Sequence, residues 1–135
     1  MARRCLGVLL LTVLVTSACS TGPSRLEILQ RNPMANPTLS FAEPARQVGT
    51  EGDSDPWLGN ASETRIVTRF ENIPGELIDT GRDELLEQAA EGGFDLESSD
   101  TSGGGLRRES LRGSNSSGMH LTISVRDDSF QISLR

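Results

Sequence analysis

The only histidine of this 135-residue chain is the first residue to consider for catalysis. Thr122 and Ser124 follow His120 at alternate positions, and the alternating polar and apolar residues of this stretch predict a strand. All three polar side chains would then share one face, as a base and a nucleophile must. Such an enzyme also needs a strained nucleophile turn and an oxyanion hole, for which the sequence has no signature. We therefore interpret His120 as a surface residue and predict that the protein is not an enzyme and needs no cofactor.

Acidic residues at helical spacing form the second candidate site, made of Asp79, Asp83, Glu87 and Glu91. Residues four apart lie on the same side of a helix, so these carboxylates predict an acidic stripe that could dock a basic partner. A solvated helix face is the alternative interpretation. Residues 53–55, Asp-Ser-Asp, begin like a calcium loop, but the later ligands and the glycine of that loop are missing, so we predict no metal site.

The third candidate is Cys19, which ends a distinct N-terminal segment. Arg3 and Arg4 are followed by an apolar run over residues 5–15 and by the small residues 16–18. The apolar run is shorter than the roughly 20 residues that span a bilayer. This arrangement is typical of an export signal that is removed, and we predict a signal peptide over residues 1–18.

The five residues Val15-Thr16-Ser17-Ala18-Cys19 resemble the lipobox of bacterial lipoproteins, in which small residues precede a cysteine. The resemblance covers about residues 1–20. It implies cleavage between Ala18 and Cys19, a diacylglyceryl thioether on Cys19 and acylation of the new amino group. Two or three acyl chains hold a protein stably on a membrane without a transmembrane helix.

Thr16 departs from the commonest lipobox, which has leucine three residues before the cysteine. Thr16 and Ala18 also suit an ordinary signal peptidase cutting the same bond, which would leave Cys19 as a lone thiol in a secreted protein. The adjacent arginines fit either the general secretory or the twin-arginine export route.

Charge limits the classes of partner. Removing residues 1–18, two of them arginines and none acidic, leaves 117 residues and changes the net charge from −6 to −8. Neither nucleic acid nor an anionic bilayer attracts a chain that is acidic overall, and the sequence displays no run of basic residues. We therefore expect no nucleic-acid partner, and we expect the lipid alone to hold the protein on the membrane.

Residues 19–62 contain five of the six prolines and little apolar periodicity. We predict a lipid-anchored tether here, largely extended or disordered, with one short helix near 24–31 that begins with the capping box Ser24-Arg25-Leu26-Glu27. The alternative is that Leu39, Phe41, Val48 and Trp57 attach this arm to the folded domain.

Residues 63–135 have the patterns of a small α+β domain. Residues 65–71 alternate as a strand, a helix capped by Thr80 runs to Glu91 and stops at Gly92-Gly93, and residues 119–134 form a β-hairpin around Asp127-Asp128. Between helix and hairpin, residues 97–118 are rich in serine and glycine, with a possible strand near 106–111. We predict one helix packed on a small antiparallel or mixed sheet whose other face is polar and open to water. The expected core consists of Ile66, Phe70, Leu85, Leu86, Ala89, Leu121, Ile123, Val125, Phe130 and Ile132.

The mature part is loosely similar to small lipoproteins of high-GC Gram-positive bacteria that have no assigned activity, through Asn32-Pro33-Met34-Ala35 and the order of helix and hairpin. We expect a lipoprotein on the extracytoplasmic face of the cell membrane that acts as a non-enzymatic binding or structural module. Its contact surface would be the open sheet face or the acidic stripe. The alternative is a soluble secreted inhibitor or immunity-type protein with an unlipidated Cys19.

Overall fold

The computed structural model describes residues 22–50, 54–55, 59–60 and 63–135. The predicted signal peptide, Ala18, Cys19 and Trp57 lie outside these residues. The elements, in chain order, are α1 (Arg25–Gln30), the 3₁₀ turn η1 (Pro33–Ala35), β1 (Ala45–Gly49), β2 (Ser54–Asp55), β3 (Gly59–Asn60), β4 (Arg65–Phe70), the 3₁₀ turn η2 (Gly75–Leu77), α2 (Ile78–Glu91), β5 (Glu97–Asp100), β6 (Arg108–Ser114), β7 (His120–Arg126) and β8 (Phe130–Leu134).

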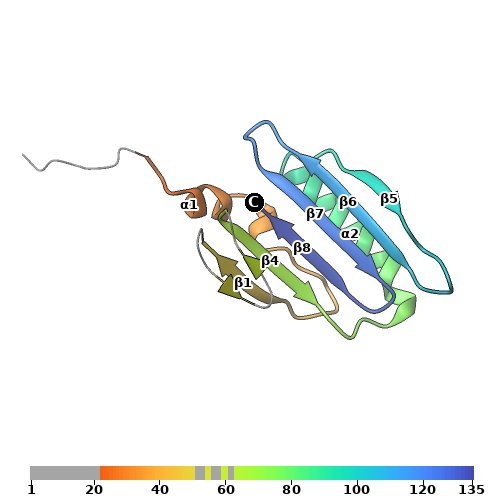
Figure 1. Cartoon of the computed structure of the whole chain (residues 1–135). Coiled ribbons are helices and arrows are strands. Elements are labelled where there is room, and N and C mark those ends of the chain that lie inside the picture. Colours follow the sequence, from red (N-terminus) through yellow and green to blue (C-terminus); the bar gives the residue numbers. More distant parts are fainter. Residues whose placement is uncertain (1–21, 51–53, 56–58, 61–62) are drawn as a thin grey trace, which may run out of the picture.

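Six of the strands form one antiparallel sheet, with α2 packed on one of its faces (Figure 1). The strand order is β1-β4-β8-β7-β6-β5, and the small β2–β3 hairpin is separate. The predicted C-terminal hairpin is confirmed as β7 and β8, in which Ile123 is opposite Ile132 and Val125 is opposite Phe130. The predicted α+β class, with a helix on an antiparallel sheet, is therefore confirmed.

Helix α2 begins earlier than the sequence predicts. Gly75–Leu77 form a 3₁₀ turn that leads directly into Ile78, so Thr80 lies inside the helix and does not cap it. The predicted stop is confirmed: Gly93 has a φ of +84°, its N–H donates to Ala90, and the N–H of Phe94 donates to Ala89. Two bonds of this kind with glycine in the left-handed region satisfy the last carbonyls of a helix.

The core lies between α2 and the sheet and follows the predicted periodicities. Every side chain of the expected core is buried except Leu86, which is half-buried against the others. On β6, β7 and β8, odd and even positions alternate between this core and the opposite face, as the pleat of a strand requires. We call the face away from α2 the outer face.

The predicted tether is wrong for residues 25–49, which belong to the folded body. Strand β1 pairs with β4 along its whole length, so the domain does not begin at residue 63. The side chains of Leu29, Met34 and Leu39 are buried in the core, and Phe41 packs against it. The alternative prediction, an arm attached to the domain, is confirmed for Leu39 and Phe41. It is not confirmed for Val48, which is 37% exposed. Isolated apolar residues between turns give no periodicity, yet they cover the part of the sheet that a single helix leaves open.

The capping box is confirmed at α1: the hydroxyl of Ser24 accepts from the N–H of Glu27, and the Glu27 carboxylate accepts from the N–H of Ser24. Farther along the arm, the side-chain amide of Asn32 donates to the carbonyl of Gly92 at 3.0 Å. The amide of Asn115 donates to the same carbonyl at 3.1 Å. These bonds join the arm, the end of α2 and the β6–β7 turn.

The segment 97–118 contains two strands, β5 and β6. Their hairpin has Gly104 and Gly105 at positive φ in its turn, at +61° and +78°. The possible strand near 106–111 is thus confirmed in kind, though β6 begins at Arg108 and extends to Ser114.

Candidate functional site

His120 lies on the outer face at the start of β7, and its side chain is exposed. Its backbone N–H donates to Arg135, and the N–H of Arg135 donates back, so His120 closes the ladder between β7 and the C-terminus. Thr122 and Ser124 share its face, as predicted, but among the described residues no hydrogen bond joins the imidazole to either hydroxyl. The geometry offers the imidazole no oriented nucleophile.

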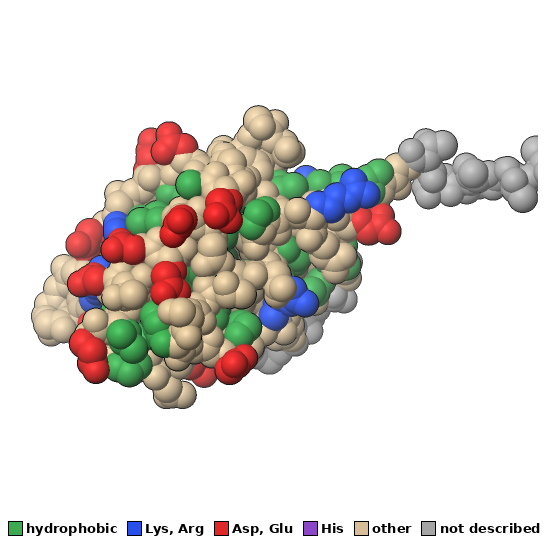
Figure 2. Space-filling model, turned by 180° about the vertical axis from the view of Figure 1, so that it is seen from behind, with side chains coloured by type: hydrophobic (Ala, Val, Ile, Leu, Met, Phe, Trp, Pro, Cys, Tyr) green, Lys and Arg blue, Asp and Glu red, His purple; other side chains and the backbone are tan. Residues whose placement is uncertain are grey.

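The predicted acidic stripe lies exposed along α2, and acidic side chains are prominent on the helix side of the molecule (Figure 2). Two of its carboxylates have arginine partners. Asp79 binds Arg107 at 2.7 Å, and Asp83 is 4.0 Å from Arg82. The stripe is therefore partly neutralised by the protein itself, which weakens it as a docking surface.

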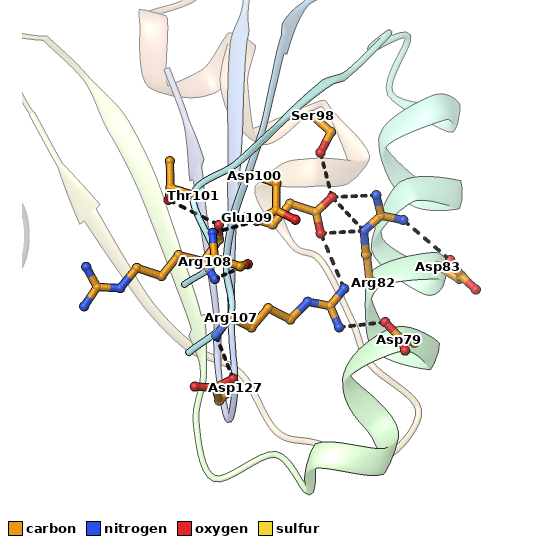
Figure 3. A network of polar contacts seen from close by, with 11 residues as sticks. Asp79, Arg82, Asp83, Ser98, Asp100, Thr101, Arg107, Arg108, Glu109 and Asp127 are labelled. Atoms are coloured by element: carbon orange, nitrogen blue, oxygen red, sulfur yellow. Dashed lines mark hydrogen bonds and ion pairs between the residues drawn. The ribbon is translucent and has the colours of Figure 1, made fainter. Parts of the chain in front are cut away.

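A buried carboxylate that the sequence analysis missed lies beneath this stripe. Glu109 is on the core side of β6 and its side chain is only 8% exposed. One carboxylate oxygen accepts from Arg82 Nη2 at 2.6 Å and from the Ser98 hydroxyl at 2.8 Å; the other accepts from Arg82 Nε at 2.9 Å. Arg107 adds a longer contact at 3.4 Å (Figure 3). Glu109 thereby ties together α2, β5 and β6.

The two arginines determine the charge state of Glu109. The hydrogen bond from Arg82 lowers the pKa of Glu109 below its ordinary value of 4.5, with the Ser98 hydroxyl and Arg107 acting in the same direction against the effect of burial. The same contact raises the pKa of Arg82. A carboxylate held ionised with both oxygens occupied is poorly suited to proton transfer. We interpret this network as a structural clamp.

The outer face carries a cluster of arginines that the sequence analysis did not identify. Arg108 and Arg112 of β6 and Arg126 of β7 alternate with the core residues of their strands, so all three point away from α2. All three are exposed. Figure 3 shows Arg108 directed to the side of β6 opposite Glu109. We call Arg108, Arg112 and Arg126 the arginine cluster.

Strand register brings the cluster together. Arg108 is directly opposite Arg126, Ser110 is opposite Ser124, and Arg112 is opposite Thr122. The three arginines and two serines line one hollow of the outer face. A second hollow shares Ser124 and Arg126 and continues over β8 to Gln131 and Arg69. Arginine and serine donors side by side are suited to bind phosphate, sulfate or carboxylate groups.

Ion pairs among the described residues do not neutralise the cluster. In the part of the chain that the structure describes, no carboxylate lies within ion-pair distance of these three guanidinium groups. Glu97 is opposite Arg112 in register without forming an ion pair, and Glu71 borders the second hollow. The side chain of Arg112 donates only to Ser110, at 3.1 Å. Arg108 and Arg126 are like charges directly opposite each other on adjacent strands. Such a pair destabilises a sheet, so the fold contains it at a cost in stability.

The protein therefore has a basic patch although its sequence displays no run of basic residues. Net charge is a sum over the chain, whereas strand parity and register sort arginines to the outer face and leave the acidic stripe on the helix. Residues 108, 112 and 126 are distant in sequence or separated by core residues, so no run of basic residues reveals them. The alternation of polar and apolar residues along β6 and β7 was the signal that could have placed these arginines on one face of the sheet.

Among the described residues, no group of three or more histidine, cysteine or acidic side chains is arranged to hold a metal ion. Those residues also include no helix that is long and apolar enough to cross a bilayer. No family model, curated protein or solved structure matches this chain.

Proposed function

We propose that this protein is a bacterial lipoprotein, anchored through Cys19 on the outer side of the cell membrane, whose folded body is a non-enzymatic binding module. The observation that carries the binding role is the exposed arginine cluster, whose three guanidinium groups form no ion pair among the described residues. The sequence of residues 1–19 supports the anchor.

The length of chain between anchor and body determines where the body lies. Helix α1 begins at Arg25, six residues after Cys19. Six extended residues span at most about 20 Å, so an anchored body stays close to the lipid headgroups. This differs from the long spacer that a tether over residues 19–62 would provide.

The sheet face is better suited to bind a partner than the acidic stripe. Two of the four carboxylates of the stripe, Asp79 and Asp83, are paired with Arg107 and Arg82, whereas the guanidinium groups of the cluster form no ion pair among the described residues. A charge already paired within the protein gains less from a partner than an unpaired one. The cluster is thus the expected contact surface.

The anchor is tested by the intact mass of the mature protein from a membrane fraction of its native host. We expect a chain that starts at Cys19 and carries diacylglycerol and an acyl group, and a Cys19→Ala variant that leaves the detergent phase. An unmodified chain that starts at Cys19 would refute the anchor and favour the soluble secreted alternative.

The binding role is tested with the Cys19→Ala chain, so that the lipid makes no contribution. This chain should be retained on washed, detergent-extracted cell envelopes of the host. Retention should be lost in the double variant Arg108→Gln and Arg126→Gln and kept in the double variant Asp83→Asn and Glu87→Gln, which changes the acidic stripe. Loss of retention only in the stripe variant would show that the contact surface is on the helix side.

A further inference from the structure

We propose that the arginine cluster binds a linear phosphate-bearing polyanion. This inference rests on the proposed binding role and names the chemistry of the partner. Four observations carry it: the spacing of the arginines, the serines between them, the lack of aromatic side chains on this face among the described residues, and the position of Arg108 and Arg126 far from α1.

The spacing of the cluster exceeds the size of a single phosphate group. Arg108 and Arg112 are four residues apart on one strand face, a separation of about 13 Å. Arg126 is directly opposite Arg108, about 5 Å away at the Cβ atoms. Donors distributed in this way can each bind a different phosphate of a chain, and an arginine binds phosphate with two parallel hydrogen bonds.

The serines extend the donor set between the guanidinium groups. Ser110 and Ser124 are opposite each other in the hollow that the three arginines line. Their hydroxyls can donate to phosphate oxygens along the line from Arg108 to Arg112. The site therefore presents a strip of hydrogen-bond donors.

The residue types of this face argue against the recognition of nucleobases. The chain has no tyrosine, and its one tryptophan, Trp57, lies outside the described residues. Of its four phenylalanines, Phe70, Phe94 and Phe130 are buried and Phe41 packs against the core. The outward residues of β6 and β7 include no aromatic ring other than the His120 imidazole. Proteins that bind single-stranded nucleic acid stack bases on aromatic side chains, so this face suits the charge of a polymer and not its bases.

The position of Arg108 and Arg126 favours a polymer over the membrane surface. Arg25 of α1 donates to the carbonyl of Gly118, which places α1 beside the start of β7. Arg126 ends β7 eight residues later, about 26 Å away along the strand direction, at the opposite end of the sheet (Figure 1). An anchor that precedes α1 therefore lies at the end of the sheet away from Arg108 and Arg126, whereas Arg112, opposite Thr122, lies nearer to α1.

The test measures binding of long-chain inorganic polyphosphate to the full mature chain in neutral detergent. We expect binding that orthophosphate at equal phosphate concentration does not reproduce. The double variant Arg108→Gln and Arg126→Gln should weaken it about tenfold or more and lower its dependence on salt concentration, because fewer counterions are released. The matched control changes Arg25→Gln and Arg31→Gln, two exposed arginines of the α1 region, and should retain wild-type affinity.

A second readout separates binding from folding. Because Arg108 and Arg126 repel each other, Arg126→Gln should unfold at an equal or higher denaturant concentration than the wild type while it binds polyphosphate more weakly.

Three results would overturn the proposal: no binding of polyphosphate by the wild type, equal losses in both double variants, or binding of phosphatidylglycerol vesicles without binding of polyphosphate. The last result would identify the membrane surface as the occupant. Retention on host envelopes and the mass of Cys19 are independent of these assays, so the proposed function can stand where the polymer proposal fails.

Discussion

The carboxylate of Glu109 shows how one buried charge is stabilised in a small core. Its oxygens accept hydrogen bonds from Arg82, Ser98 and Arg107, all within 3.4 Å. Burying a charge is costly unless paired donors replace the lost water, and here two arginines and one hydroxyl do so. Removing the charge would leave both guanidinium groups without this partner.

Glu109→Gln is expected to lower the free energy of unfolding by about 2 kcal/mol near pH 7, because hydrogen bonds between charged groups are lost. Chemical denaturation of the variant and of Glu87→Gln, an exposed carboxylate of the acidic stripe, measures the effect. The control should change stability by less than about 0.5 kcal/mol. Equal effects in the two variants would contradict the clamp.

The pH dependence of stability tests the same carboxylate. The pKa of Glu109 is lower in the folded than in the unfolded protein, so ionised Glu109 contributes stability above its ordinary pKa of 4.5. That contribution is lost as the pH falls through the lowered folded pKa. Below pH 4.5, the free energy of unfolding measured by chemical denaturation should therefore fall more steeply with decreasing pH for the wild type than for Glu109→Gln. Parallel curves would show that Glu109 is not stabilised as an anion.

At the scale of elements, α2 approaches the sheet closely because it has a glycine on its inner face. Gly81 is buried, and a Cβ atom at this position would lie 2.8 Å from Cε2 of Phe130 and 3.0 Å from Cζ of Phe41. Carbon atoms pack at about 3.5–4.0 Å, so alanine requires both rings to move. Gly81 therefore allows α2, β8 and the N-terminal arm to meet at one point.

Gly81→Ala is expected to lower the free energy of unfolding by about 1 kcal/mol, because overpacking of 1–3 kcal/mol outweighs the roughly 1 kcal/mol by which alanine favours a helix. Thermal unfolding of this variant and of Gly75→Ala measures the difference. A Cβ at Gly75 meets no atom within 4 Å, so that variant should be neutral within about 0.5 kcal/mol. A stabilised Gly81→Ala protein would mean that α2 can shift outward at little cost.

At the scale of the whole molecule, the fold depends on the arm that precedes β4. Strand β1 covers the edge of β4, and the buried side chains of Leu29, Met34 and Leu39 complete the core. Each such side chain contributes about 1.5–3 kcal/mol when buried. The sum is comparable with the 5–15 kcal/mol that stabilises a typical domain.

A chain that begins at residue 63 is therefore expected to lack a cooperative unfolding transition, whereas one that begins at residue 22 should unfold as a single unit. Circular dichroism during denaturation compares the two chains. A cooperative transition in the shorter chain at the midpoint of the longer one would show that residues 22–49 add no stability.

Local patterns were sufficient for much of the fold. The β7–β8 hairpin, the end of α2 and the capping box at Ser24 each depend on residues a few positions apart, whose periodicity and turn chemistry can be read directly. These patterns also predicted the α+β class and most of the core. The candidate at Cys19 belongs here too, because its pattern is confined to the first 20 residues.

By itself, then, the sequence determined the amphipathic elements and which of their faces is apolar, because burial of apolar side chains follows the period of a helix or a strand. Only the tertiary structure decided that β1 joins the sheet, that Glu109 meets Arg82 across 27 residues, and that Arg108 is opposite Arg126. These contacts depend on strand register and on the packing of distant segments. Their energies arise only once the chain is folded, so no short window of sequence contains them.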